Sequence, residues 1–295
     1  MSQLQSHRGL FIGVVTLDLI YLVDRPPLAN EKLAASDYTV SAGGPATNAA
    51  VAFSHLGNEA IVMGVLGMHP MAQLILTDLQ QYGVTLNDLS PTLATPPPVS
   101  SIMVTEKTGD RAVVSLNAVR AQASANIPAN SLQDVAVILI DGHQMAVGRT
   151  IAMEARSRGI PVVIDGGSWK PGFETVLPLA DYVICSANFH PPHCQSPQDV
   201  AAYLLNLGVP HIAITQGQQP IQYWTVTSAG HIDVPIVTVV DTLGAGDIFH
   251  GAFCHAILRE DFRDALAIAA NIAAQSCQYF GTRRWMEEGR GESFE

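Results

Sequence analysis

Short, nearly all-apolar segments recur along this chain and alternate with longer segments of helical pattern. Such apolar segments are typical of parallel strands that helices cover on both faces. The helical segments end at glycines such as Gly159 and Gly208, where a left-handed residue commonly closes a helix. The sequence therefore predicts an α/β fold with a mostly parallel central sheet and helices on both of its faces. The predicted strands are Leu10–Val15, Ala60–Val65, Val135–Ile140, Ile160–Ile164, Tyr182–Cys185 and His211–Thr215.

Two regions break this pattern because their apolar and polar residues alternate. They are Glu31–Ser41, and the pair formed by Ser100–Thr105 and Ala112–Asn117. Such alternation is typical of a strand that has one buried face and one solvent-exposed face. We predict that residues 14–41 and 98–118 contribute the strands of a small β-sheet flap, with an extension of the main sheet edge as the alternative. All 295 residues would then form one domain.

The composition predicts a folded enzyme with a large core, because 48% of the residues are hydrophobic and only 14% are charged. The formal net charge of −11 would repel a polyphosphate backbone, so we expect no nucleic-acid partner. No apolar stretch approaches the ~20 residues of a membrane-spanning helix, so we expect no membrane insertion. The four cysteines form no CxxC pair, which favours reduced thiols and a cytoplasmic location.

The segment Asp241–Asp247 reads Asp-Thr-Leu-Gly-Ala-Gly-Asp and is the most informative motif. It follows an apolar segment that we expect to be a strand, Ile236–Val240, and precedes the helical pattern Ile248–Leu258. Glycines at such a turn let backbone N–H groups converge on an anion at the positive end of a helix. We therefore predict a phosphate-binding turn. Asp247 would then be a general base for an attacking hydroxyl, with a helix N-cap as the alternative.

A second glycine-rich turn, Ser41–Pro45, leads into the helical pattern Ala46–Leu56. Pro45 suits the first turn of a helix, and the two glycines before it allow a ligand close to the backbone. Asn48 would lie on that first turn, where its amide offers a donor and an acceptor to a hydroxyl. The alternative role for Asn48 is a local backbone cap.

With both motifs present, the chain resembles the ribokinase-like (PfkB) carbohydrate kinases over nearly its whole length. The segment from Gly43–Asn48 to Gly57 is similar to the family's first signature. Asp241–Asp247 matches the second signature, Asp-Thr-x-Gly-Ala-Gly-Asp. The opening segment Gly13–Asp24 is also similar to the ketohexokinase or fructose-type branch.

The resemblance implies an ATP-dependent phosphoryl transfer to a hydroxyl of a small sugar. It implies that Asp247 is the base and that the N–H groups of Gly244, Ala245 and Gly246 stabilise the transferred group. It also makes the small flap a lid over the sugar, which would exclude water during transfer. The substrate-binding residues that it implies or suggests are Asp18, Gly43, Gly44, Asn48 and Arg111. For Arg111, a solvent-exposed turn residue is the alternative.

The resemblance further implies ATP and Mg²⁺ as cofactors, and in some members a monovalent cation such as K⁺. The implied nucleotide-side residues are Asn188, Thr215, Gly217, Asn271 and Gly281. Two departures stand out. The acid of the family's NxxE motif is absent from Asn188–Pro191, and Pro220 replaces the last glycine of its TxGxxG turn. How magnesium is positioned without that acid stays open.

Two alternative functions stay open. The chain could be a nucleoside kinase of the same fold, or it could be a catalytically impaired sensor of a sugar or a nucleotide. We predict no metal centre built by the protein, because His190–Cys194 offers two His and one Cys without a nearby fourth ligand. The segment Asp165–Lys170 follows a strand end and either borders the nucleotide phosphates or is a simple turn. Partners would be the sugar and ATP, and the flap edges leave a homodimer through the lid open.

Overall fold

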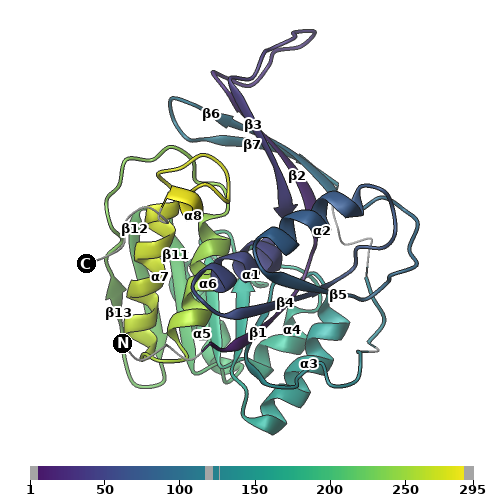
Figure 1. Ribbon diagram of the computed structural model, residues 1–295. Helices are drawn as coiled ribbons and strands as arrows, with labels where there is room; N and C mark the ends of the chain where they lie inside the picture. The colour runs from purple at the N-terminus through teal and green to yellow at the C-terminus, as the bar shows by residue number, and fades with distance from the viewer. Residues whose placement is uncertain (1–5, 117–121, 126, 289–295) are drawn as a thin grey trace, which may run out of the picture.

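The computed structural model describes residues 6–116, 122–125 and 127–288. Within this part, nine strands form one sheet in the order β13-β12-β11-β10-β9-β8-β1-β4-β5 (Figure 1). From β11 to β5 all neighbours pair in parallel, whereas β12 and β13 are antiparallel additions at one edge. The strands are β1 (Arg8–Ile12), β4 (Glu59–Gly64), β5 (Val84–Asp88), β8 (Val135–Ile140), β9 (Val162–Gly166), β10 (Tyr182–Ser186), β11 (His211–Gln216), β12 (Gln219–Thr225) and β13 (Ala229–Ile232).

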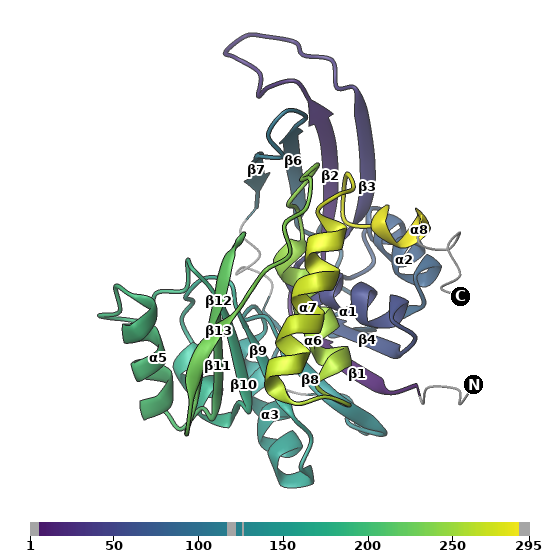
Figure 2. The same ribbon diagram turned by 90° about the vertical axis from the view of Figure 1, so that its left-hand side faces the viewer.

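Helices cover both faces of this sheet, as the sequence predicts (Figure 2). On β1, Phe11 packs on the face covered by α1, α6 and α7, while Leu10 and Ile12 pack on the opposite face with α3 and α5. Such alternation buries both faces of each central strand. The helices are α1 (Pro45–His55), α2 (Ala72–Gln81), α3 (Met145–Arg158), α4 (Phe173–Val176), α5 (Pro197–Asn206), α6 (Ala245–Ala256), α7 (Phe262–Ser276) and α8 (Trp285–Glu288).

Glycines follow two of the helices, as the sequence predicts. Gly159 and Gly208, with φ of 68° and 86°, follow α3 and α5 in left-handed conformation.

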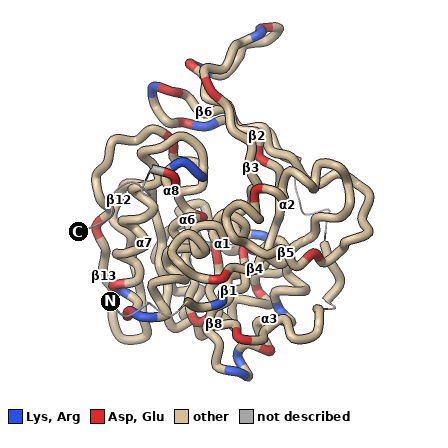
Figure 3. The backbone as a smooth tube through the Cα atoms, in the orientation of Figure 1, with Lys and Arg blue, Asp and Glu red and all other residues tan. Residues whose placement is uncertain are grey.

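Within the described residues, no helix is both long enough and apolar enough to span a bilayer. Figure 3 shows basic positions interspersed with acidic ones along the backbone.

A separate four-stranded sheet, the lid, rises beyond one edge of the main sheet (Figures 1 and 2). Its order is β3-β2-β6-β7, in which β2 pairs antiparallel with β3 and parallel with β6. The flap predicted from alternating polarity is therefore confirmed as a distinct sheet, although Asn117, the predicted end of its last strand, lies outside the described residues. The lid strands are β2 (Thr16–Val23), β3 (Asp37–Gly43), β6 (Val99–Thr105) and β7 (Arg111–Ser115).

Three strand predictions were wrong in extent or in kind. The first predicted strand, Leu10–Val15, ends at Ile12. Residues 31–36 belong to a long connection between β2 and β3, where Glu31 pairs with Arg25, so the strand begins only at Asp37. The segment Ile236–Val240 is not a strand. The N–H groups of Val240 and Asp241 both donate to the carbonyl of Cys277 at 2.8 and 3.1 Å, so this segment attaches to the end of α7. The apolar residues of this segment led to the strand prediction, but they do not form a buried strand, and Ile236 is fully exposed.

Helices α1 and α6 lie in backbone contact, and this contact positions the residues of the two motifs. A Cβ at Gly251 of α6 would lie only 2.2 Å from the carbonyl oxygen of Ala49 on α1. Because any side chain at this position would separate the helices, glycine sets their distance. The first turns of α1 and α6, which carry Asn48 and Asp247, are thereby held side by side.

We predict that Gly251→Ala lowers the free energy of unfolding by about 1–3 kcal/mol, because the added methyl group overpacks the contact between α1 and α6. Chemical denaturation measures this change. The matched control is Gly148→Ala in α3, where the new Cβ would meet a side-chain atom of Ile140 at 3.0 Å rather than a backbone carbonyl. Equal stability of the two variants would contradict the role assigned to Gly251.

Candidate active site

A pocket of about 250 Å³ lies between the lid and the carboxyl edge of the main sheet. Open α/β sheets bind their ligands at this edge. The lid contributes Asp18, α1 contributes Asn48, the segment after β8 contributes His143, and α6 contributes Asp247. The structure therefore brings the two glycine-rich motifs of the sequence together in one pocket.

The first turn of α6 is an open anion-binding turn. Gly244 caps it in left-handed conformation with φ of 72°. Ala245 N–H donates to the Thr242 carbonyl at 3.3 Å, but the N–H groups of Gly246 and Asp247 have no acceptor within the described residues. Two free donors at the positive end of a helix favour a phosphate.

The carboxylate of Asp241 holds the loop around this turn. It accepts the N–H of Leu243 at 2.8 Å and the N–H of Gly281 at 2.9 Å. These two bonds tie the start of the motif to the loop that follows α7. Gly281 adopts φ of 75°, which favours glycine at that position.

Asp247 lies at the wall of the pocket with its carboxylate fixed by a neighbour. Asn48 Nδ2 donates to Asp247 Oδ2 at 2.8 Å. Burial, followed by the nearby carboxylate of Asp165, raises the pKa of Asp247 to about 7, while the bond from Asn48 lowers it. A carboxyl whose pKa lies near neutral pH is suited to accept a proton from a hydroxyl.

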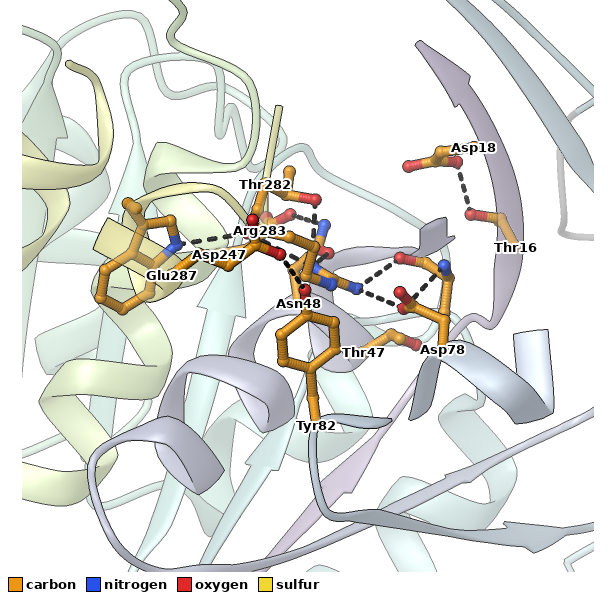
Figure 4. Close-up of polar contacts among 12 residues, drawn as sticks. Thr16, Asp18, Thr47, Asn48, Asp78, Tyr82, Asp247, Thr282, Arg283 and Glu287 are labelled. Atoms are coloured by element: carbon orange, nitrogen blue, oxygen red, sulfur yellow. Dashed lines mark hydrogen bonds and ion pairs between the residues drawn. The ribbon is translucent and has the colours of Figure 1, made fainter. Parts of the chain in front are cut away.

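A buried arginine fixes the orientation of Asn48, as Figure 4 shows. Arg283 is 6% exposed, and its Nη1 donates to Asn48 Oδ1 at 3.0 Å. Its Nη2 donates to the carbonyl of Ala42 at 2.7 Å and to Asp78 Oδ2 at 3.1 Å. Because the amide oxygen of Asn48 faces the guanidinium, its NH₂ group must face Asp247.

Asp18 stands on the lid side of the pocket. Thr16 Oγ1 donates to Asp18 Oδ1 at 2.8 Å, and burial raises the pKa of this carboxyl. A Cβ at Gly43 would lie 2.0 Å from Asp18 Oδ2, so this position has room only for glycine. Gly44 adopts φ of 102° as it enters α1. These glycines leave the Asp18 carboxylate open to a ligand.

A fully buried carboxylate, Asp141, organises the pocket directly after the end of β8. Its Oδ2 accepts the N–H groups of Val14 at 3.0 Å and Ala46 at 3.2 Å. Its Oδ1 lies 3.0 Å from His143 Nδ1. Burial opposes ionisation, but His143 and the N–H donors outweigh it and hold the pKa of Asp141 below its usual value. His143 contacts Asp141 through Nδ1, so its Nε2 atom is not bonded to that carboxylate.

The predicted nucleotide-side residues lie elsewhere than in this pocket. Thr215 lies one residue before the end of β11, and its hydroxyl donates to the Cys185 carbonyl at 3.3 Å, while Gly217 forms the next turn with φ of 60°. Asn188 follows β10, while Asn271 donates to the carbonyl of Ala267 in its own helix at 2.8 Å. Asn188, Thr215 and Gly217 share the carboxyl edge of neighbouring strands.

Arg111 does not line the pocket. Its Nη1 donates to the carbonyl of Thr242 at 2.9 Å and to Thr242 Oγ1 at 3.1 Å. Arg111 therefore ties the lid to the loop before the anion-binding turn.

The sequence analysis missed Asp78, Asp141, His143 and Arg283. The run Asp-Gly-His directly after the strand Val135–Ile140 was the available signal for Asp141 and His143, because polar residues at strand ends meet at the ligand edge. The adjacent pair Arg283 and Arg284 was a weaker signal in a chain with only 15 Lys and Arg residues.

We predict that Arg283→Lys lowers the free energy of unfolding by more than about 2 kcal/mol, because Asn48 and the Ala42 carbonyl lose a buried donor. Arg284→Lys is the matched control, since Arg284 pairs with Asp37 at a partly exposed site and should change stability by less than about 1 kcal/mol. Urea denaturation of both variants checks this. Similar losses in the two variants would contradict the network.

Comparison with known proteins gives a consistent picture. Residues 7–288 match the family described as pfkB family carbohydrate kinase. The ribokinase of Bacillus subtilis (strain 168) is 27% identical over 284 residues, covering 93% of this chain and 94% of the relative. The structure of Arabidopsis thaliana ribokinase complexed with ribose and ATP has a TM-score of 0.75 at 20% identity, covering 98% of this chain and 100% of that one.

An E. coli protein described as a ribokinase II, in complex with ATP and Mg²⁺, has a TM-score of 0.77 at 20% identity, with 97% and 98% coverage. The ribokinase-like fold that the sequence predicts is therefore confirmed, and so is the prediction of a sugar kinase. The match covers most of the chain and includes both glycine-rich motifs. The chain thus belongs to the pfkB family of carbohydrate kinases.

Proposed function

We propose that this chain transfers the γ-phosphoryl group of ATP to a hydroxyl of a small sugar bound under the lid, with Asp247 as the general base. One observation carries the proposal. The Asp247 carboxylate and the free N–H groups of Gly246 and Asp247 belong to one turn of α6. A base for the attacking hydroxyl and donors for the transferring group thus lie together, which is the arrangement that phosphoryl transfer requires.

The polar lining of the pocket supports a sugar as the acceptor. Asp18 offers carboxylate oxygens to adjacent hydroxyls, and Ser100 and Ser115 add hydroxyl groups from the lid. Among the lining residues that the structure describes there is no Phe, Tyr or Trp side chain to stack on a nucleobase. This feature favours a sugar kinase over a nucleoside kinase, and the ketohexokinase-type branch stays a prediction.

ATP would enter from the strand ends beside this pocket. We assign Thr215 and Gly217 to its phosphates, with Asn271 and Gly281 on the adenine side. Within the described residues, no three His, Cys, Asp or Glu side chains are grouped to hold a metal ion. Mg²⁺ commonly keeps water and phosphate ligands and needs few protein ligands, so this chain fits a magnesium ion that arrives with ATP. Asn188 is the side chain that we assign to that assembly, and a K⁺ site stays a prediction.

The lid would exclude water during the transfer. Arg111 bonds to Thr242, and a Cβ at Gly109 would lie 3.1 Å from Val239, so the β6–β7 hairpin rests on the loop before the anion-binding turn. A closed site limits attack of water on ATP.

The test is ADP formation from Mg²⁺ and ATP over a panel of ketoses, aldoses, sugar phosphates and nucleosides. We expect one sugar to give turnover, and Asp247→Asn to lose about 10²–10⁴-fold in kcat because the base is removed. Asp264→Asn is the matched control on an exposed turn of α7 and should keep full activity.

Two outcomes would overturn this assignment. If Asp247→Asn retains turnover, Asp247 is not the base. If no compound turns over while ATP or a sugar still raises the melting temperature, the chain is a sensor rather than a kinase.

The outer face of the lid supports a second proposal, a homodimer formed through the lid. Tyr38 on β3 and Val114 on β7 are 67% and 68% exposed, and both belong to edge strands. Exposed apolar side chains on unpaired edges favour association with another strand or sheet.

We predict that Tyr38→Lys shifts the sedimentation coefficient from that of a dimer to that of a monomer. Leu74→Lys, at an exposed apolar position on α2, is the control and should leave the dimer intact. A wild-type monomer at micromolar concentration would contradict the proposal.

A further inference from the structure

His250 is a buried histidine one turn after Asp247 on α6. It is 5% exposed. Its Nδ1 lies 2.7 Å from the carbonyl oxygen of Gly246, and its Nε2 lies 3.3 Å from the carbonyl oxygen of Ile184 on β10. A carboxylate oxygen of Asp165, at the end of β9, lies 3.7 Å from Nδ1.

Both ring nitrogens of His250 therefore face oxygen atoms that can only accept hydrogen bonds. A neutral imidazole carries one N–H and one lone pair, so it would direct its lone pair at one of the two carbonyls. Only the doubly protonated ring donates to both. A buried charge of this kind needs a counter-charge, and Asp165 supplies one at ion-pair distance.

The bond to Gly246 acts on the anion-binding turn directly. The Gly246 carbonyl belongs to the same peptide group as the N–H of Asp247, which has no acceptor within the described residues. Donation from a charged ring to that carbonyl polarises the peptide and makes its N–H a stronger donor. A phosphoryl group held at the first turn of α6 would meet this strengthened donor.

The same charge balances the carboxylates around the base. Burial raises the pKa of Asp247 most, and the carboxylates of Asp165 on β9 and Asp18 on β2 raise it further, whereas the Asn48 amide and His250 lower it. Burial and the Asp141 carboxylate raise the pKa of Asp165, whereas His250, Lys170 and His143 lower it. A positive charge at His250 therefore offsets part of the opposition of the Asp165 carboxylate to ionisation of Asp247.

We propose that His250 is an imidazolium that, paired with Asp165, polarises the Gly246–Asp247 peptide and holds the base and the anion-binding turn ready for phosphoryl transfer. It is a positioning residue, since it acts through Gly246 and Asp247. The catalytic role of His250 rests on the proposed function, but the inference about its charge state does not.

The charge state is tested on the wild-type protein without substrate. In ¹⁵N NMR of histidine-labelled protein at the pH of the kinase assay, with the His250 signal assigned by its loss in His250→Gln, we expect both ring nitrogens to be protonated. A non-protonated ring nitrogen under these conditions would overturn the proposal. Because this readout needs no turnover, it separates failure of the inference from failure of the kinase assignment.

The catalytic part is tested with His250→Gln, whose amide can still donate to Gly246 but carries no charge. We expect kcat to fall at least about tenfold while the KM for the sugar stays within about twofold. The wild-type activity should decline as the pH falls through about 7, where Asp247 becomes protonated. In His250→Gln this decline should move to higher pH, and an unchanged profile would refute the assigned role.

Two further variants separate charge from packing. His255→Gln lies on the same helix, where burial lowers the pKa of His255 to about 4, so this neutral histidine is the control and should leave the pH profile unchanged. Combining His250→Gln with Asp165→Asn removes both charges. We expect the double variant to unfold at higher urea than His250→Gln alone, because the unpaired carboxylate is gone, and simple additivity would contradict the pair.

Discussion

The hydrogen bond from Asn48 to Asp247 is the contact on which the arrangement of this site depends. It joins residues that are 199 positions apart and that belong to the two glycine-rich motifs. The bond is possible because α1 and α6 approach to backbone contact at Gly251, and its direction is set by Arg283. One interaction thus links the packing of two helices, a buried cation and the orientation of the proposed base.

Four carboxylates gather near the carboxyl edge of the sheet, and each has a different environment. Asp141 is held ionised by N–H donors and His143, whereas Asp18 meets hydroxyl groups and remains open to the pocket. Asp165 has an imidazole as its neighbour, and Asp247 has an amide. Because like charges at short range oppose one another, these separate partners are what allow acidic groups to lie so close together.

The sequence predicted the features that depend on local pattern. Apolar strands, glycine-terminated helices and the alternating strands of the lid were found because each follows from the periodicity of its own residues. Ile236–Val240 failed because an apolar run does not reveal whether a neighbouring strand exists to pair with it. Arg283 was missed for a related reason, since its partners Asn48 and Asp78 are distant in sequence and no local pattern marks such a contact.

The division of the pocket between lid and body has a consequence for how tightly a ligand can be held. Asp18 lies on β2 of the lid, whereas Asp247 lies on α6 of the body. Only three residues, 13–15, separate β1 of the main sheet from β2. If the lid swings about this short connection, the two carboxylates separate and neither half retains the full set of contacts. Ligand binding and lid closure are then a single equilibrium. The time for which a ligand stays bound is limited by the lifetime of the closed lid rather than by the strength of any single hydrogen bond.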